Sequence, residues 1–128
     1  MIIIGSGSRD WKTSIPIRKV MRQIKTEFPT FTYYHGDQFG FDKISAYELK
    51  RIGHTDIRAF PYIRELGKAG GMARNRQMLL EAFIYELPKD IMIVAMPLPQ
   101  SKGTFGMINL AQQAKTQIRI YDQNGDLV

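Results

Sequence analysis

Short apolar runs alternate with amphipathic segments along the whole of this 128-residue chain. Apolar residues at helical spacing predict helices, and short apolar or aromatic runs between turn residues predict strands. The expected strands cover residues 2–5, 31–35, 56–60, 90–96 and 117–121, and the expected helices start near Pro16 and cover residues 41–52, 72–87 and a stripe from Met107 to Ala114. This alternation predicts an α/β fold with a doubly wound, parallel five-stranded sheet of order 3-2-1-4-5 and helices on both faces.

Length and composition limit the class of protein. The chain has the length of one domain, expected over residues 1–128, and its 44% hydrophobic and 23% charged residues are typical of globular proteins. No apolar run approaches the roughly 20 residues that span a bilayer, and the start lacks the pattern of a signal peptide, so we expect a cytoplasmic protein without a membrane partner.

Residue types also limit the chemistry. The chain has no cysteine and two histidines, which excludes disulfides, thiolate nucleophiles and cysteine-based metal sites and predicts no metal centre. Any reaction would depend on carboxylates, hydroxyls or a bound small molecule.

Two loops of small residues follow apolar strands. Residues 5–10 (Gly-Ser-Gly-Ser-Arg-Asp) follow the first strand, and Ser101 to Thr104 lie between the fourth strand and the next helix. A glycine-rich turn lets backbone N–H groups approach an anion, and a helix N-terminus favours negative charge. In order 3-2-1-4-5 the switch point lies between strands 1 and 4, so we expect the two loops to share one phosphate site there.

Two common nucleotide motifs are absent from these loops. Asp10 stands where the third glycine of a G-x-G-x-x-G fingerprint would be, and no G-x-x-x-x-G-K-[ST] pattern occurs. These departures argue against an ordinary NAD-dependent dehydrogenase and against a P-loop ATPase.

Four groups of residues, in this order and spacing, resemble the YspA-related (YAcAr-type) branch of the SLOG (SMF/DprA-LOG) superfamily. They are Gly5-Ser6-Gly7-Ser8-Arg9-Asp10-Trp11, His35-Gly36-Asp37 with Gly40 and Asp42, Gly67-Lys68-Ala69-Gly70-Gly71 with Arg74-Asn75-Arg76 and Met78, and Ser101-Lys102-Gly103-Thr104. The resemblance implies a Rossmann-like fold that binds or processes a nucleotide or a nucleotide-derived ligand, such as an ADP-ribose or NAD-derived compound. It implies no further cofactor.

The resemblance leaves the reaction open. LOG enzymes split the N-glycosidic bond of a nucleoside monophosphate and carry a glutamate three residues after the threonine of the late glycine motif, where this chain has Met107. We therefore expect binding, in a sensing or sequestering role, and keep hydrolysis of an N-glycosidic or phosphoryl bond as the alternative.

Candidate residues follow from the motifs. Arg9, Arg74 and Arg76 suit a phosphate because a guanidinium group donates paired hydrogen bonds. The alternative for each of these arginines is a solvated position on the surface. Trp11 either stacks on a base or fills the core beneath the first loop. The expected ligand-binding residues are Gly5, Ser6, Gly7, Ser8, Arg9, Asp10, Trp11, Gly36, Lys68, Arg74, Asn75, Arg76, Ser101, Gly103 and Thr104.

Two carboxylates near the end of the second strand are the candidate catalytic residues. Asp37 and Asp42 could bind ribose hydroxyls, and Asp37 could act as a general base or stabilise an oxocarbenium-like centre. The alternative for Asp42 is capping of the second helix.

Charge suggests a competing function. The net charge is +6, and Arg18, Arg22 and Lys25 share one face of the first helix, opposite its apolar stripe. A basic face could bind nucleic acid, as in a DprA-like relative, but a solvated outer face has the same pattern, so nucleic acid is the second choice. A homodimer or higher homo-oligomer through the helix from Met72 also stays open.

Overall fold

The computed structural model describes residues 1–128 as five strands, four α-helices and two 3₁₀ segments. In chain order these are β1 (Ile2–Gly7), α1 (Ile15–Glu27), β2 (Thr32–His35), α2 (Phe41–Arg51), β3 (Ile57–Ala59), η1 (Arg64–Ala69), α3 (Gly70–Tyr85), η2 (Pro88–Asp90), β4 (Ile91–Met96), α4 (Lys102–Gln113) and β5 (Gln117–Ile120).

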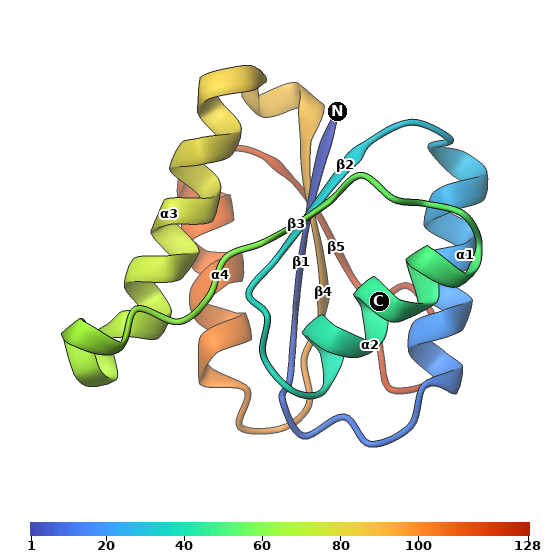
Figure 1. Ribbon diagram of the computed structural model, residues 1–128, viewed down its shortest axis with the longest axis horizontal. Helices are drawn as coiled ribbons and strands as arrows, with labels where there is room; N and C mark the ends of the chain where they lie inside the picture. The colour runs from blue at the N-terminus through green and yellow to red at the C-terminus, as the bar shows by residue number, and fades with distance from the viewer.

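The strands form one sheet in the order β3-β2-β1-β4-β5, and every neighbouring pair is parallel (Figure 1). This confirms the expected fold class and strand order. The central strand β1 pairs with both β2 and β4, with Ile2 opposite Thr32 on one side and Ile91 on the other.

Helices cover both faces of the sheet. In Figure 1, α1 and α2 lie on one side and α3 and α4 on the other. Ile3 packs into a core cluster with Met21 and other residues of α1, while Ile2 and Ile4 pack into a second cluster with Met78 and Met107. The alternation of side chains along a strand thus divides the core into two layers.

The first strand is longer than the sequence predicts. Gly5, Ser6 and Gly7 pair with residues 94–96 of β4, so the loop begins at Ser8 rather than at Gly5. A Cβ at Gly5 would lie 1.8 Å from Tyr33 Oη, and one at Gly7 would lie 2.3 Å from Phe41 Cγ. These glycines make room for buried rings, which differs from the expected role of exposing N–H groups to an anion.

The outer face of α3 is partly apolar. Leu80, Ile84 and Tyr85 are exposed there, as is Leu87 just beyond the helix. The homodimer expected through this helix stays a prediction.

None of the helices combines the length and apolar character needed to cross a bilayer.

Candidate functional site

A cavity of about 460 Å³ opens at the carboxyl ends of β1 and β4, where the direction of the strand order reverses. This is the position where open α/β sheets bind ligands. Sixteen residues line the cavity: Ser6, Gly7, Ser8, Arg9, Asp10, Gln38, Lys68, Gly71, Met72, Arg74, Asn75, Gln100, Ser101, Lys102, Gly103 and Thr104. The two predicted segments therefore do meet, together with the start of α3, although residues 102–104 of the second form the first turn of α4 and not a loop before it.

The lining is polar and mostly positive. It contains four cationic side chains, Arg9, Lys68, Arg74 and Lys102, and a single carboxylate, Asp10. Met72 is its one hydrophobic residue. A concave surface with this excess of positive charge attracts anions.

Arg74 is the buried cation of the site. Its Nη1 donates to the carbonyl oxygen of Gly36 at 2.7 Å, and its Nε donates to Asn75 Oδ1 at 3.2 Å. Burial lowers the pKa of Arg74, and the nearby Asp42 carboxylate opposes that shift. The group stays protonated because guanidinium does not lose its proton in proteins, so a fixed positive charge stands at the cavity wall.

Gly36 makes the position of the Arg74 guanidinium possible. A Cβ at Gly36 would lie 2.3 Å from Arg74 Nη1, so only glycine leaves space for the guanidinium. Gly36 does not line the cavity itself. Its role in the site is to position Arg74.

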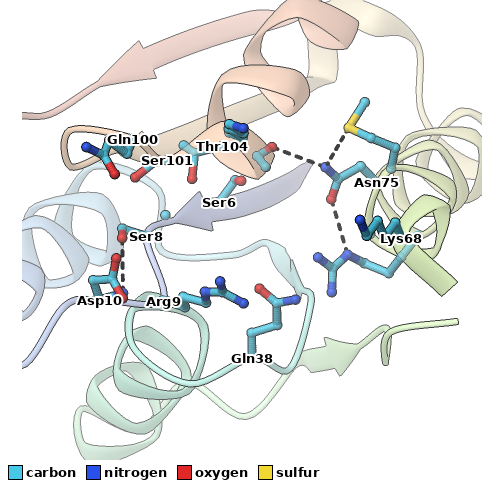
Figure 2. A pocket seen from close by; sticks show the side chains of 16 residues that line it. Ser6, Ser8, Arg9, Asp10, Gln38, Lys68, Asn75, Gln100, Ser101 and Thr104 are labelled. Carbon is cyan, nitrogen blue, oxygen red and sulfur yellow. Dashed lines mark hydrogen bonds between the residues drawn. The ribbon is translucent and has the colours of Figure 1, made fainter. Parts of the chain in front are cut away.

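Asn75 joins α3 to the start of α4. Its Nδ2 donates to the carbonyl oxygen of Gly103 at 3.3 Å and lies 3.7 Å from Met72 Sδ (Figure 2). Both ends of the amide are therefore occupied by protein partners, because Oδ1 already accepts from Arg74.

Two buried hydroxyls shape the loops. Ser8 Oγ accepts from the backbone N–H of Asp10 at 3.0 Å, and Ser101 Oγ accepts from the N–H of Leu98 at 2.8 Å. Such local bonds fix turns before a helix or after a strand.

Two other buried hydroxyls have no partner in the protein. Ser6 is 8% exposed and Thr104 is 3% exposed, and Figure 2 shows both beside the cavity with no hydrogen bond drawn to their side chains. No fully buried side-chain nitrogen or oxygen lacks a partner, so these two oxygens remain accessible from the cavity. They are free to bind a ligand.

Trp11 does not line the cavity. It is 6% exposed, belongs to the core cluster beside α1, and donates from Nε1 to the Met96 carbonyl oxygen at 2.8 Å. The structure therefore places its ring in the core, which was the alternative to stacking on a base.

The candidate catalytic carboxylates also lie outside the cavity. Asp37 is exposed, has a φ of 57°, and pairs with Lys43 at 3.1 Å. Asp42 is buried in the first turn of α2, where its Oδ2 accepts from the N–H of Gln38 at 3.3 Å. Gly40, rather than Asp42, occupies the N-cap position, so Asp42 ties the preceding turn to the helix without being its cap.

Burial raises the pKa of Asp42 to about 6, although backbone hydrogen bonds and Arg74 act in the opposite direction. A carboxylate with such a pKa suits proton transfer, but this one faces the turn and not the cavity. Asp10 is the carboxylate that lines the cavity.

Two other residues expected at the site also lie outside the cavity. Gly5 is enclosed by Tyr33, and Arg76 is exposed on α3 outside the cavity. The sequence interpretation missed Gln38, Gly71, Met72, Gln100 and Lys102, although each lies next to or within one of the quoted motifs.

The basic face of α1 is partly used within the fold. Arg18 Nε pairs with Glu48 at 3.1 Å, Lys19 pairs with Asp126, and Lys25 Nζ donates to the Pro29 carbonyl oxygen. Arg22 is exposed and forms no ion pair. Several of the cations that suggested nucleic-acid binding therefore form ion pairs or hydrogen bonds with neighbouring segments of the protein.

Comparison of this chain with protein-family models, with curated proteins and with solved structures found no match.

Proposed function

We propose that this protein binds a nucleotide or nucleotide-derived small molecule in the cavity between the ends of β1 and β4. The cationic cavity at the switch point of the sheet carries the proposal. The resemblance to the SLOG superfamily supports the same function and the same position. No further cofactor is part of the proposal.

The charges of the cavity fit a phosphate-bearing ligand of moderate affinity. Hydrogen bonds to charged groups contribute about 1.5–3 kcal/mol each, and a micromolar dissociation constant corresponds to about 8 kcal/mol. Two or three such bonds from Arg9, Arg74 and Lys102 sum to about 3–9 kcal/mol before the cost of association is subtracted, so micromolar affinity needs further polar contacts in the cavity besides these cations.

Binding is favoured over hydrolysis as the proposed activity. Asp37 and Asp42 lie outside the cavity, and Met107, which stands in the place of the LOG glutamate, is fully buried. A hydrolase would have to use Asp10, the one carboxylate of the lining.

The test is titration calorimetry with AMP, ADP-ribose and NAD, with mass spectrometry to detect products. We expect at least one of them to bind, and we expect Arg9→Ala and Lys102→Ala each to weaken binding about tenfold. Arg76→Ala is the matched control, because this arginine is exposed on α3 and outside the cavity, and it should change affinity less than twofold.

Two results would overturn parts of the proposal. If none of the ligands binds, or if Arg76→Ala weakens binding as much as Arg9→Ala does, the cavity is not the binding site. Release of a free base or phosphate by the wild-type protein, lost in Asp10→Asn, would establish hydrolysis in place of binding alone.

A further inference from the structure

We infer that the cavity recognises the phosphorylated sugar of its ligand and leaves the base unread, so that different nucleobases are accepted with similar affinity. This inference rests on the proposed function, since it specifies which part of a nucleotide the same cavity holds.

The first observation is the absence of aromatic side chains from the lining. None of the sixteen lining residues is Phe, Tyr, Trp or His, and the single tryptophan is held in the core by its bond to Met96. Proteins that hold a base by its face use aromatic side chains for stacking. The cavity has no such surface.

The second observation concerns the buried polar groups. A site discriminates strongly between similar ligands when its buried donors and acceptors are satisfied by one ligand and not by the other. The buried amide of the cavity, that of Asn75, is already bonded to Arg74 and Gly103. No other buried amide side chain lines the cavity, because Gln38 is half-buried and Gln100 is exposed.

The buried groups that remain free match a phosphate and a sugar. The Ser6 and Thr104 hydroxyls have no protein partner, and Arg74 provides a fixed positive charge in the lining of the same cavity. The N-terminus of the twelve-residue helix α4 begins at Lys102 and adds backbone N–H groups at the same edge. Asp10 adds a carboxylate, which repels phosphate but accepts hydrogen bonds from sugar hydroxyls.

Together these observations assign the two ends of the ligand. The phosphate would lie at the Arg74, Ser6 and Thr104 wall, and the sugar hydroxyls would face Asp10. The base would then extend toward the rim, where the side chains are exposed and bind water as readily as they bind a ligand.

The test compares affinities by titration calorimetry on the intact chain for AMP, GMP, CMP, UMP, ribose 5-phosphate, adenosine and inorganic phosphate. We expect the four mononucleotides to agree within about threefold and ribose 5-phosphate to bind within about tenfold of AMP. Adenosine should bind at least 100-fold more weakly than AMP, because it lacks the charge that the cations bind.

Several results would overturn the inference while leaving the proposed function intact. A spread above tenfold among the mononucleotides, or binding of AMP without binding of ribose 5-phosphate, would show that the base is read. Inorganic phosphate that binds as tightly as ribose 5-phosphate would show that the sugar is not read. Failure of every phosphate-bearing probe would overturn the inference, and it would overturn the proposed function as well if ADP-ribose and NAD also failed to bind.

Variants locate the effect in the cavity. Thr104→Val keeps the shape of the side chain and removes its hydroxyl, so it should weaken ribose 5-phosphate and all four mononucleotides by the same factor, about tenfold. Ser6→Ala is the second variant in case the first fails to fold, and urea denaturation of both checks that stability is retained.

Matched controls address the exposed aromatic residues near the rim. Phe39 follows Gln38, Tyr62 lies 3.5 Å from a Cβ built at Gly71, and Phe105 follows Thr104. Each should tolerate substitution by alanine without loss of affinity. If one of these variants weakens AMP but not ribose 5-phosphate, the base stacks on that ring and the inference is wrong.

Discussion

Individual side chains at the carboxyl edge of the sheet either hold the loops or remain free. Ser8 and Ser101 bind backbone N–H groups of their own loops, whereas the hydroxyls of Ser6 and Thr104 bind no protein group. Removing a hydroxyl of the first kind leaves a backbone donor unpaired and costs stability, while removing one of the second kind affects only the ligand.

The glycines of β1 offer a test of packing at single positions. Gly5→Ala would place a Cβ 1.8 Å from Tyr33 Oη and 2.5 Å from Cζ, and that ring is fully buried and bonded to Ser45 Oγ. The ring cannot swing into solvent, so we expect a loss of about 1–3 kcal/mol in the free energy of unfolding. Urea denaturation measures it.

Gly103→Ala is the matched control for this variant. A Cβ at Gly103 meets nothing within 4 Å, and the residue lies inside α4. Alanine is the better helix former by about 0.5–1 kcal/mol, so this variant should be at least as stable as the wild type. Equal losses in the two variants would contradict the packing argument.

Asp42 predicts a pH dependence. Because burial raises its pKa from 3.8 to about 6, the folded protein binds this proton more tightly than the unfolded chain does. Its contribution to stability is fully present below the unfolded value and is lost as the pH rises through the folded value. Each pKa unit corresponds to about 1.4 kcal/mol, so the loss approaches 3 kcal/mol.

Asp42→Asn removes this titration. The free energy of unfolding of the variant minus that of the wild type should therefore increase between pH 3.8 and a pH above 6. Urea denaturation at half-unit steps across this interval measures the difference, in which the titration of other groups cancels. A difference that stays constant with pH would mean that the carboxyl is not buried as described.

Between elements, one carboxylate joins α2 to α1. Glu48 is 3% exposed and accepts from Arg18 Nε at 3.1 Å and from Arg51 Nη1 at 3.4 Å. Arg18→Ala leaves a buried carboxylate with only its longer contact, so we expect a loss of about 1–2 kcal/mol by urea denaturation. Arg22→Ala, an exposed arginine of the same helix, should change stability by less than about 0.5 kcal/mol. A loss of similar size in both variants would show that the pair does not stabilise the contact between the helices.

The elements themselves could be predicted because their signals are local. Spacing of apolar residues placed the helices and strands, and the alternation of the two types predicted the parallel sheet and its order. The continuation of β1 through Gly5 and Gly7 could not be predicted in this way. Glycine disfavours strands, and the rings of Tyr33 and Phe41 that occupy the space come from distant parts of the chain.

Local sequence patterns also do not show which side of a helix or strand faces the site. Arg74 and Arg76 are two residues apart, which on a helix is a rotation of about 200°, so their side chains point about 160° apart and only one can face the cavity. Arg74 does, because the sheet end and Gly36 lie on that side. Trp11 and Asp42 belong to motifs that lie near the site, but Trp11 packs in the core and Asp42 binds a turn. The sequence shows that a residue is close to the site along the chain, but it does not show where the side chain points.

At the scale of the whole molecule, the cavity is assembled from distant parts of one chain. Its walls extend from Ser6 in β1 to Thr104 in α4. Arg74 joins α3 to Gly36, just after β2, and Asn75 joins α3 to Gly103 in α4. The net charge of +6 favours approach of an anionic ligand to this edge. A ligand held there would contact segments on both faces of the sheet at once.

Because the cavity is built from distant parts of the chain, we expect the whole domain to unfold in one cooperative transition, and we expect a bound ligand to raise the midpoint of that transition. We expect scanning calorimetry to show a single transition with equal calorimetric and van't Hoff enthalpies, as for one domain with a shared central sheet. AMP at 100 times its dissociation constant adds about 2.7 kcal/mol, which for a chain of this length raises the midpoint by about 10 °C. The transition should shift without splitting, because unfolding of any wall destroys the cavity. Two transitions, of which AMP moves only one, would mean that the layers on the two faces of the sheet unfold separately and that the cavity belongs to one of them.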